Sequence, residues 1–177
     1  IVRFDGSNDY MNLSAINTFN LIQNNDFTIF MVGKLTSNSG SAQVMLYTSN
    51  ASSRLSLQVT SGRLRFDFVN GSTGSLLAAS NSSIYNVNSL ITFEKEASAQ
   101  SIYINGALSS TQTNSLVYTQ YSDELSLGSY YNYLNSAHSN FTSLDLGELI
   151  IFSRVIKPEE REAIETYLSK KWNIKIS

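Results

Sequence analysis

Cysteine is absent from the 177 residues, which excludes a disulfide framework and any metal site held by thiolates. Histidine occurs only once, at His138, so a three-histidine metal site is excluded as well. Charged residues make up only 15% of the chain, below the roughly one quarter that is usual for globular domains. Ser, Thr and Asn supply the missing polarity, which favours turns and hydrogen bonds over charge.

The chain also lacks a cluster of positive charge and a long hydrophobic run. The net charge is -2 and the lysines and arginines are scattered, so nucleic acid is not expected as a partner. No run is long enough to span a membrane, and we expect no membrane insertion. The sequence starts at Ile1 inside a strand-like pattern, so we expect a domain of a longer protein. Its low charge favours an extracellular location, on a cell or virion surface.

Short β-strands are predicted along nearly the whole chain. Polar and apolar residues alternate over 55–59 and 63–68, which predicts strands with one buried and one wet face. Residues 27–32 are almost continuously apolar and predict a central strand buried on both sides. Further strands are predicted at 44–47, 90–93, 101–104, 125–127 and 148–152. Ser61-Gly62 and Asn105-Gly106 predict tight hairpin turns, so the pattern indicates a sandwich or barrel.

The hydrophobic period changes after Pro158. Ala163, Ile164, Tyr167, Leu168 and Trp172 follow helical spacing, so a helix is predicted from about Pro158 to Lys171, docked by one face on the sandwich. No internal repeat or linker is visible, and we expect a single domain over 1–177.

Three segments resemble one known family. Residues 2–11 (VRFDGSNDYM) are similar to the opening of laminin-G-like jelly rolls, and residues 101–108 (SIYINGAL) are similar to a hairpin of that family. Residues 144–152 (LDLGELIIF), with the helix that follows to Ile174, resemble the ending of its bacterial and phage members. The resemblance implies an all-β fold: a two-sheet antiparallel jelly-roll sandwich, concanavalin A-like, with a short C-terminal helix. Trp172 is expected to fill the core where that helix lands.

Catalysis is not expected, although the family's fold hosts glycosidases and lyases as well as lectins and spacers. A glycosidase needs two carboxylates that flank the scissile bond. The nearest pair is Glu94 and Glu96, which we interpret as a solvated hairpin end. A lyase would want a base such as His138, but one sequence shows no partner group that converges on it. We therefore predict a protein that is not an enzyme.

The segment 130–140 carries the best candidate ligand-binding residues. Three Tyr, three Asn and one His fall within eleven residues, and sugars are bound by aromatic faces together with amide groups. The predicted ligand-binding residues are Tyr130, Tyr131, Asn132, Tyr133, Asn135, His138 and Asn140. The same mixture also suits a protein contact or simple packing on a neighbouring strand, and these alternatives stay open.

A structural calcium ion is the one cofactor that the resemblance suggests. Relatives place an Asp immediately before the Glu of the last strand, but this chain has Gly147 there. Asp5, Asp9 and Asp145 could still gather near the chain ends, because Ca²⁺ takes six to eight oxygen ligands.

The expected function is that of a non-catalytic carbohydrate-binding or adhesion module of a surface or virion protein. Its partner would be a glycan or cell-surface polysaccharide. The alternative is a structural or oligomerising decoration domain of a phage or bacterial surface fibre, whose partners would be neighbouring domains or subunits of the fibre or capsid. A polysaccharide lyase or glycosidase is the third possibility.

Overall fold

The computed structural model describes eight stretches of the chain, and for residues 53, 70 and 73–78 it describes the backbone alone. The described residues are 1–13, 26–36, 43–49, 53–70, 73–78, 84–113, 125–132 and 136–177.

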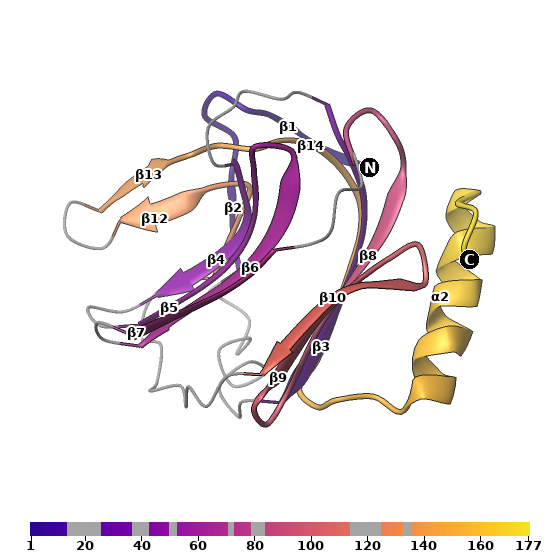
Figure 1. Ribbon diagram of the computed structural model, residues 1–177. Helices are drawn as coiled ribbons and strands as arrows, with labels where there is room; N and C mark the ends of the chain where they lie inside the picture. Colours follow the sequence, from indigo (N-terminus) through magenta and orange to yellow (C-terminus); the bar gives the residue numbers. More distant parts are fainter. Residues whose placement is uncertain are drawn as a thin grey trace.

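Two antiparallel sheets face each other across a shared core (Figure 1). The first, sheet A, has the strand order β1-β14-β3-β8-β9-β10. Its strands are β1 (Val2–Asp5), β14 (Ser143–Phe152), β3 (Phe27–Leu35), β8 (Ser89–Glu96), β9 (Ala99–Ile104) and β10 (Ala107–Thr113). The predicted two-sheet sandwich is therefore confirmed.

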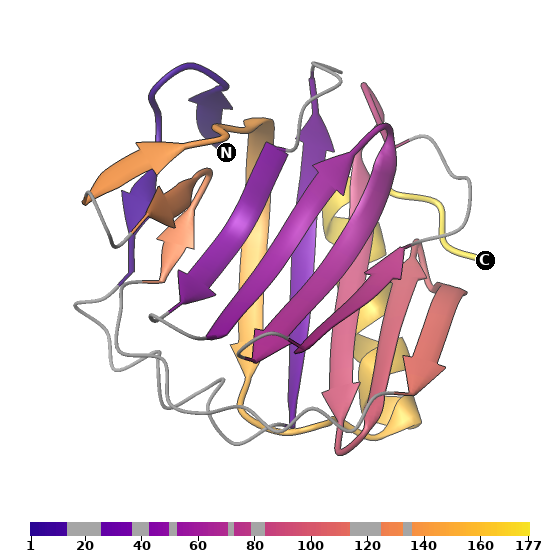
Figure 2. The ribbon, with the colours of Figure 1, turned by 60° about the vertical axis from the view of Figure 1, so that its left-hand side comes forward.

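The second, sheet B, has the order β2-β11-β4-β5-β6-β7. Its strands are β2 (Met11–Asn12), β11 (Ser126–Leu127), β4 (Gln43–Ser49), β5 (Ser53–Thr60), β6 (Arg63–Asn70) and β7 (Thr73–Ala78). A separate two-stranded hairpin, β12 (Tyr130–Asn132) and β13 (Ala137–Ser139), projects from one side of this sheet (Figure 2).

The predicted alternation of the strands is confirmed, because every second side chain of β5 and β6 enters the core. Leu55, Leu57, Phe66 and Phe68 are all fully buried in the cluster between the sheets. The facing strands contribute Phe27, Ile29, Met31, Phe93 and Ile102 to the same cluster. Both predicted turns also hold, because Asn105 and Gly106 have φ of 52° and 83°, and Ser61 and Gly62 have φ of 50° and 79°.

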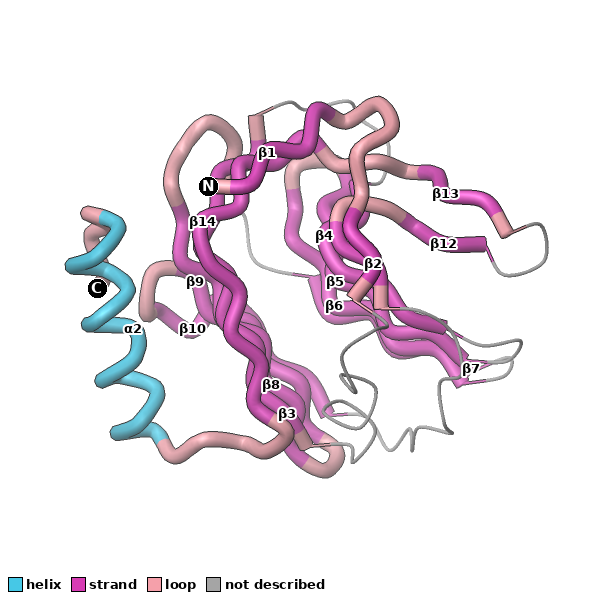
Figure 3. The backbone as a smooth tube through the Cα atoms, turned by 180° about the vertical axis from the view of Figure 1, so that it is seen from behind, coloured by secondary structure: helices cyan, strands magenta, loops and turns pink. Residues whose placement is uncertain are grey.

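A helix, α2 (Pro158–Trp172), covers the outer face of sheet A (Figure 3). A second apolar cluster lies beneath it, built from Phe30, Val32, Leu90, Ile156, Leu168 and Ile174. Strand β3 thus sends side chains into both clusters, as its nearly continuous apolar sequence predicted.

The prediction of which helix residues are buried is partly wrong. Tyr167 is 56% exposed and Ala163 is exposed, whereas Glu165, Leu168 and Ser169 are buried. Trp172 is half-buried and lies on the outer face of sheet A rather than between the sheets. Its indole reaches to within 2.8 Å of the position that a Cβ on Gly147 would occupy, and its Nε1 donates to Glu148 Oε2 at 2.8 Å. The glycine at 147 therefore gives this ring its space.

Candidate ligand-binding site

The β12–β13 hairpin divides the predicted ligand-binding residues between two faces. Tyr130 is paired with Ser139, and Tyr131 with His138. Neighbouring residues of a strand point to opposite sides, so Tyr130 faces sheet B while Tyr131 and His138 face away from it. Asn132 and Asn140 belong to the same hairpin, and Tyr133 and Asn135 lie outside the described residues. The described part of the segment is thus a two-sided projection and not one continuous surface.

A cleft lies between the inner side of the hairpin and the outer face of sheet B. The ring of Tyr130 lies over Tyr47 of β4, with centroids 4.5 Å apart and planes inclined by 56°. The cleft has a volume of about 130 Å³ and is lined by Val44, Tyr47, Arg54, Ser56, Gln58, Asp67, Tyr130 and Asn140. Among the predicted residues that the structure describes, only Tyr130 and Asn140 line it.

A partly buried ion pair lines the cleft. Arg54 donates from Nε and Nη2 to Asp67 Oδ2, at 3.0 and 2.8 Å. The Asp67 side chain is only 8% exposed, whereas that of Arg54 is 46% exposed. The carboxylate therefore holds the guanidinium at the surface, where its remaining N–H groups can meet a ligand.

Positive charge dominates the outer face of β5 and β6 in sheet B. The register Thr60↔Arg63, Gln58↔Arg65 and Ser56↔Asp67 places these side chains on one face, together with Arg54. Three arginines thus share a face with one aspartate, although the whole chain carries a net charge of -2. The Nε of Arg65 is buried and donates to no acceptor among the described residues.

Burial also changes the chemistry of Tyr47. The loss of solvent around its hydroxyl raises the pKa of Tyr47 well above its usual value, so the phenol stays protonated. Tyr47 is only 3% exposed, so it supports the ring of Tyr130 that lies over it.

Sequence reasoning missed Tyr47, Arg54, Ser56, Gln58, Arg65 and Asp67. On β5 and β6 these are the polar residues that alternate with apolar ones in the sequence. The sequence analysis interpreted them only as the solvent-facing side of the strands. What the sequence could not supply is the register between β4, β5 and β6, which places these residues side by side.

The outer side of the hairpin carries a separate aromatic cluster. His138 stacks on Tyr10 with centroids 3.5 Å apart and planes inclined by 18°, and Tyr131 lies 5.1 Å from the same ring. Ser129 Oγ lies 2.7 Å from His138 Nδ1 and 2.9 Å from Ser126 Oγ. Tyr10, which the sequence analysis did not single out, is 46% exposed. The ring of His138 is thus held in place by stacking and by a hydroxyl.

The three aspartates predicted to hold calcium are not brought together. Asp145 accepts from Arg3 at 2.6 and 3.1 Å and lies 3.6 Å from Lys34 Nζ. The hydrogen bonds from Arg3 lower the pKa of Asp145. Asp5 and Asp9 instead accept from backbone N–H groups of their own turn, those of Ser7 and Asp5. Within the described stretches, no three His, Cys, Asp or Glu side chains group as metal ligands would. Calcium binding itself stays a prediction, tested by whether added Ca²⁺ raises the melting temperature.

The interpretation of residues 94–96 as a hairpin end is confirmed, because β8 ends at Glu96 and a turn leads directly into β9, but solvent reaches only part of this end. Strand β8 runs through all three residues, and Lys95 is fully buried. The ammonium of Lys95 donates to the carbonyl of Ala97, and desolvation lowers the pKa of Lys95. Glu94 is half-buried beneath the helix, where desolvation raises its pKa although Arg161 opposes that shift.

A cavity of about 440 Å³ borders Glu94 and Glu96 at the N-terminal end of α2. Arg161 crosses it, with its guanidinium carbon 3.8 Å from the ring centroid of Tyr103 and its Nε 3.9 Å from Glu165 Oε2. Glu165 in turn accepts from Thr92 Oγ1 at 2.8 Å. These charges join the helix to the sheet, so we assign the group a structural role.

No helix of the described residues is long and apolar enough to cross a membrane.

Solved structures with the same fold come from several bacterial proteins. The chain aligns with the CBM40 of a Ruminococcus gnavus IT-sialidase bound to α2,3-sialyllactose, at a TM-score of 0.73 and 17% identity, covering 93% of this chain and 94% of that one. The NanB sialidase of Streptococcus pneumoniae aligns at a TM-score of 0.72 and 14% identity, over 90% of this chain and 27% of that one. A structure from a study of the interaction of botulinum neurotoxin type C with two ganglioside molecules aligns at a TM-score of 0.71 and 15% identity, over 94% of this chain and 42% of that one.

These similarities establish the fold alone, because each identity is low. The chain spans about a quarter of the length of the first sialidase that it matches, at 26%. No curated protein sequence matches the chain. The sequence profile of the concanavalin A-like lectin/glucanases superfamily (Laminin_G_3) matches residues 5–160. The match covers most of the chain, which therefore belongs to this superfamily, as the resemblance of its three segments predicted.

Proposed function

We propose that this chain is a non-catalytic carbohydrate-binding module that binds a sialylated or similarly acidic glycan in the cleft between the β12–β13 hairpin and sheet B. The observation that carries the proposal is the position of Arg54 in a cleft bordered by Tyr130, whose ring lies on Tyr47. Arg65 adds a second guanidinium on the same face, opposite Gln58, which lines the cleft. Aromatic faces stack on the C–H patches of a sugar ring, and guanidinium groups bind carboxylates through paired hydrogen bonds.

Two further features support an acidic ligand. The positive charge of this face runs against the net negative charge of the chain, so it attracts anions selectively. Structures with this fold include a CBM40 bound to α2,3-sialyllactose and a neurotoxin studied with ganglioside molecules. An extracellular location, on a cell or virion surface, is part of the same proposal, since such glycans are met there.

Calorimetric titration with α2,3-sialyllactose and with lactose tests the proposal, because the two sugars differ by the acidic residue. We expect sialyllactose to bind more tightly. Replacing Arg65 by Gln should weaken that binding by roughly tenfold or more, since a hydrogen bond to a charged group is lost. Lys170→Gln on the exposed side of α2 is the matched control and should leave binding unchanged.

The outcomes separate the two parts of the proposal. Equal binding of both sugars, unchanged in Arg65→Gln, would overturn the preference for an acidic glycan. Silence on a broad glycan array would overturn carbohydrate binding itself.

A protein contact is the second candidate function, because the outer side of the hairpin is also exposed and aromatic. Tyr10 and Met11 are 46% and 41% exposed beside His138 and Tyr131. Grouped exposed aromatics are common at protein interfaces. This surface would suit a decoration or oligomerising domain of a phage or bacterial fibre or capsid. Sedimentation that shows a dimer or trimer, lost in Tyr10→Ser, would favour this function.

A further inference from the structure

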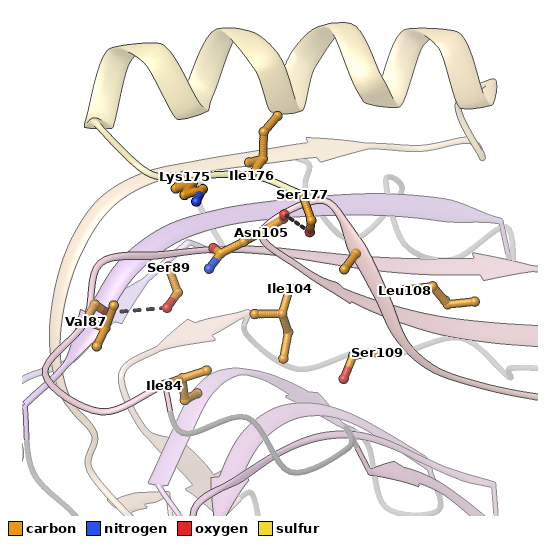
Figure 4. A pocket seen from close by; sticks show the side chains of 11 residues that line it. Ile84, Val87, Ser89, Ile104, Asn105, Leu108, Ser109, Lys175, Ile176 and Ser177 are labelled. Atoms are coloured by element: carbon orange, nitrogen blue, oxygen red, sulfur yellow. Dashed lines mark hydrogen bonds between the residues drawn. The ribbon is translucent and has the colours of Figure 1, made fainter.

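A second pocket lies on the opposite side of the molecule from the proposed glycan cleft. It has a volume of about 430 Å³ and is bordered by the segment before β8, by the turn between β9 and β10, and by the C-terminal residues (Figure 4). Figure 2 shows the hairpin β12–β13 at the left edge and the β9–β10 turn with the C-terminus at the right. A ligand in this pocket would therefore not compete with a glycan in the cleft.

Apolar side chains form the floor and one rim of this pocket. Ile84 is 2% exposed and belongs to the core between the sheets, so the pocket opens onto that core. Ile104 and Ile176 are half-buried walls. Val87 and Leu108 stand at the rim and are 53% and 55% exposed, which is unusual for large aliphatic side chains. The volume falls within the range of roughly 300–1,000 Å³ that is typical of small-molecule sites.

A hydrogen-bond donor is fixed at the polar side of the pocket. The Asn105 side chain accepts a hydrogen bond at Oδ1 from the backbone N–H of Leu90, at 2.9 Å. This contact determines the orientation of the amide, because only the oxygen can accept. Its NH₂ group is thereby turned toward the space between Ser89 and Ile104 (Figure 4). The donor is set before any ligand arrives.

The C-terminal residues add a positive charge and are themselves held in place. Ser177 donates from its backbone N–H and its Oγ to the carbonyl of Asn105, at 3.0 and 3.3 Å. Lys175 is the one charged side chain among the described residues that line the pocket, which include no Asp or Glu. Glu165 lies close to Gly106, but Thr92 and Arg161 hold its carboxylate. The polar side thus offers donors and a cation.

We propose that this pocket binds a small amphipathic anion, a carboxylate with an aliphatic body. The body would pack on Ile84, Ile104 and Leu108, and the carboxylate would accept hydrogen bonds from the Asn105 NH₂ group and from Lys175. Charge complementarity selects an anion over an amine, and the apolar floor selects a chain over a simple acetate. The assignment is independent of the glycan cleft.

Titration with octanoate, hexanoate and octylammonium tests the proposal, with binding followed by the NMR shifts of the Ile104 and Leu108 methyl groups. We expect octanoate to bind more tightly than hexanoate, by roughly fourfold for each added CH₂ that is buried. Octylammonium should bind far more weakly than octanoate, because it meets Lys175. Equal affinity of octanoate and octylammonium, or no gain with chain length, would overturn the proposal.

Asn105→Asp is the decisive variant. Aspartate tolerates the positive φ of this turn and keeps an oxygen for the Leu90 N–H, while the NH₂ donor becomes a negatively charged acceptor. Octanoate affinity should fall by roughly tenfold to a hundredfold. Asn173→Asp is the matched control, since Asn173 has the same φ of 52° at the end of α2 and lines no part of the pocket. Unchanged octanoate binding in a folded Asn105→Asp variant would overturn the assignment.

Lys175→Gln measures the contribution of the rim charge and should weaken octanoate by roughly twofold to fivefold. Lys170→Gln should have no effect. Octanoate could instead act as a detergent. NMR signals would then change throughout the core and not chiefly at the Ile104 and Leu108 methyl groups, and the proposal would be wrong.

Discussion

The outer faces of the two sheets differ in what covers them. The outer face of sheet A carries Phe30, Val32 and Leu90, and α2 buries all three. The outer face of sheet B carries Arg54, Arg65 and other polar side chains, and in the described residues only the β12–β13 hairpin overhangs it. One outer face thus contributes to stability, and the other is the face to which we assign recognition in the proposed function. Four predictions test this difference between the two outer faces.

Phe30→Ala should have the largest effect, because it removes a fully buried ring from the cluster beneath α2. We expect the free energy of unfolding to fall by about 3–5 kcal/mol, through lost apolar burial and the cavity left behind. Chemical denaturation measures this change. Gln58→Ala, on the outer face of sheet B, is the paired variant and should change stability by less than about 0.5 kcal/mol. An equal loss of unfolding free energy at both positions would show that the two outer faces contribute equally to stability.

Glu165→Gln should show a smaller effect that depends on pH. Burial raises the pKa of the Glu165 carboxyl, while Thr92 and the facing Arg161 oppose that shift. The stability that this group contributes is therefore present in full below its ordinary pKa and is lost as pH rises through the raised value. Glutamine mimics the protonated form, so the variant should gain stability relative to the wild type as pH rises above the ordinary carboxyl pKa of about 4. Thermal melts at a series of pH values measure the difference, and parallel curves would contradict the assignment.

The strands and turns could be predicted because they depend on local patterns. Alternation located β5 and β6, and Asn105-Gly106 located a turn. Prediction failed where distant segments meet. Lys95 lies between Glu94 and Glu96 at a hairpin end, yet it is fully buried and its ammonium donates to the carbonyl of Ala97.

The candidate site shows the same limit. Residues 130–132 were correctly identified as aromatic and polar, yet their division between two faces depends on the pairing of Tyr131 with His138. Tyr10 reaches His138 from the start of the chain, and Arg54 meets Asp67 through the register of two strands. Composition reveals neither contact, because each is set by which strands lie side by side.

Tyr130→Ala and Tyr131→Ala should separate the two sides of the hairpin. Tyr130 lies over Tyr47 in the cleft, whereas Tyr131 faces away beside His138. Loss of one stacking contact, worth roughly 0.5–1.5 kcal/mol, should weaken sialyllactose by a few-fold to about tenfold in Tyr130→Ala only. Calorimetry measures the affinity, and the melting temperature of both variants should stay near that of the wild type. Weaker binding in Tyr131→Ala alone would move the site to the outer side.

Arg63→Gln and Lys171→Gln should have the smallest effects and should divide by face. Lys171 pairs with Glu148 at 2.9 Å on the side of α2, so its loss should lower stability by at most about 1 kcal/mol and leave glycan binding unchanged. Arg63 stands at the end of the arginine row of sheet B, so its loss should leave stability unchanged and weaken an acidic glycan by a few-fold. Added salt should screen the Arg63 contribution, because that side chain is exposed, and the difference between wild type and Arg63→Gln should shrink as ionic strength rises. A difference that persists in high salt would mean that Arg63 acts through packing, and the charge of this face would then not select the ligand.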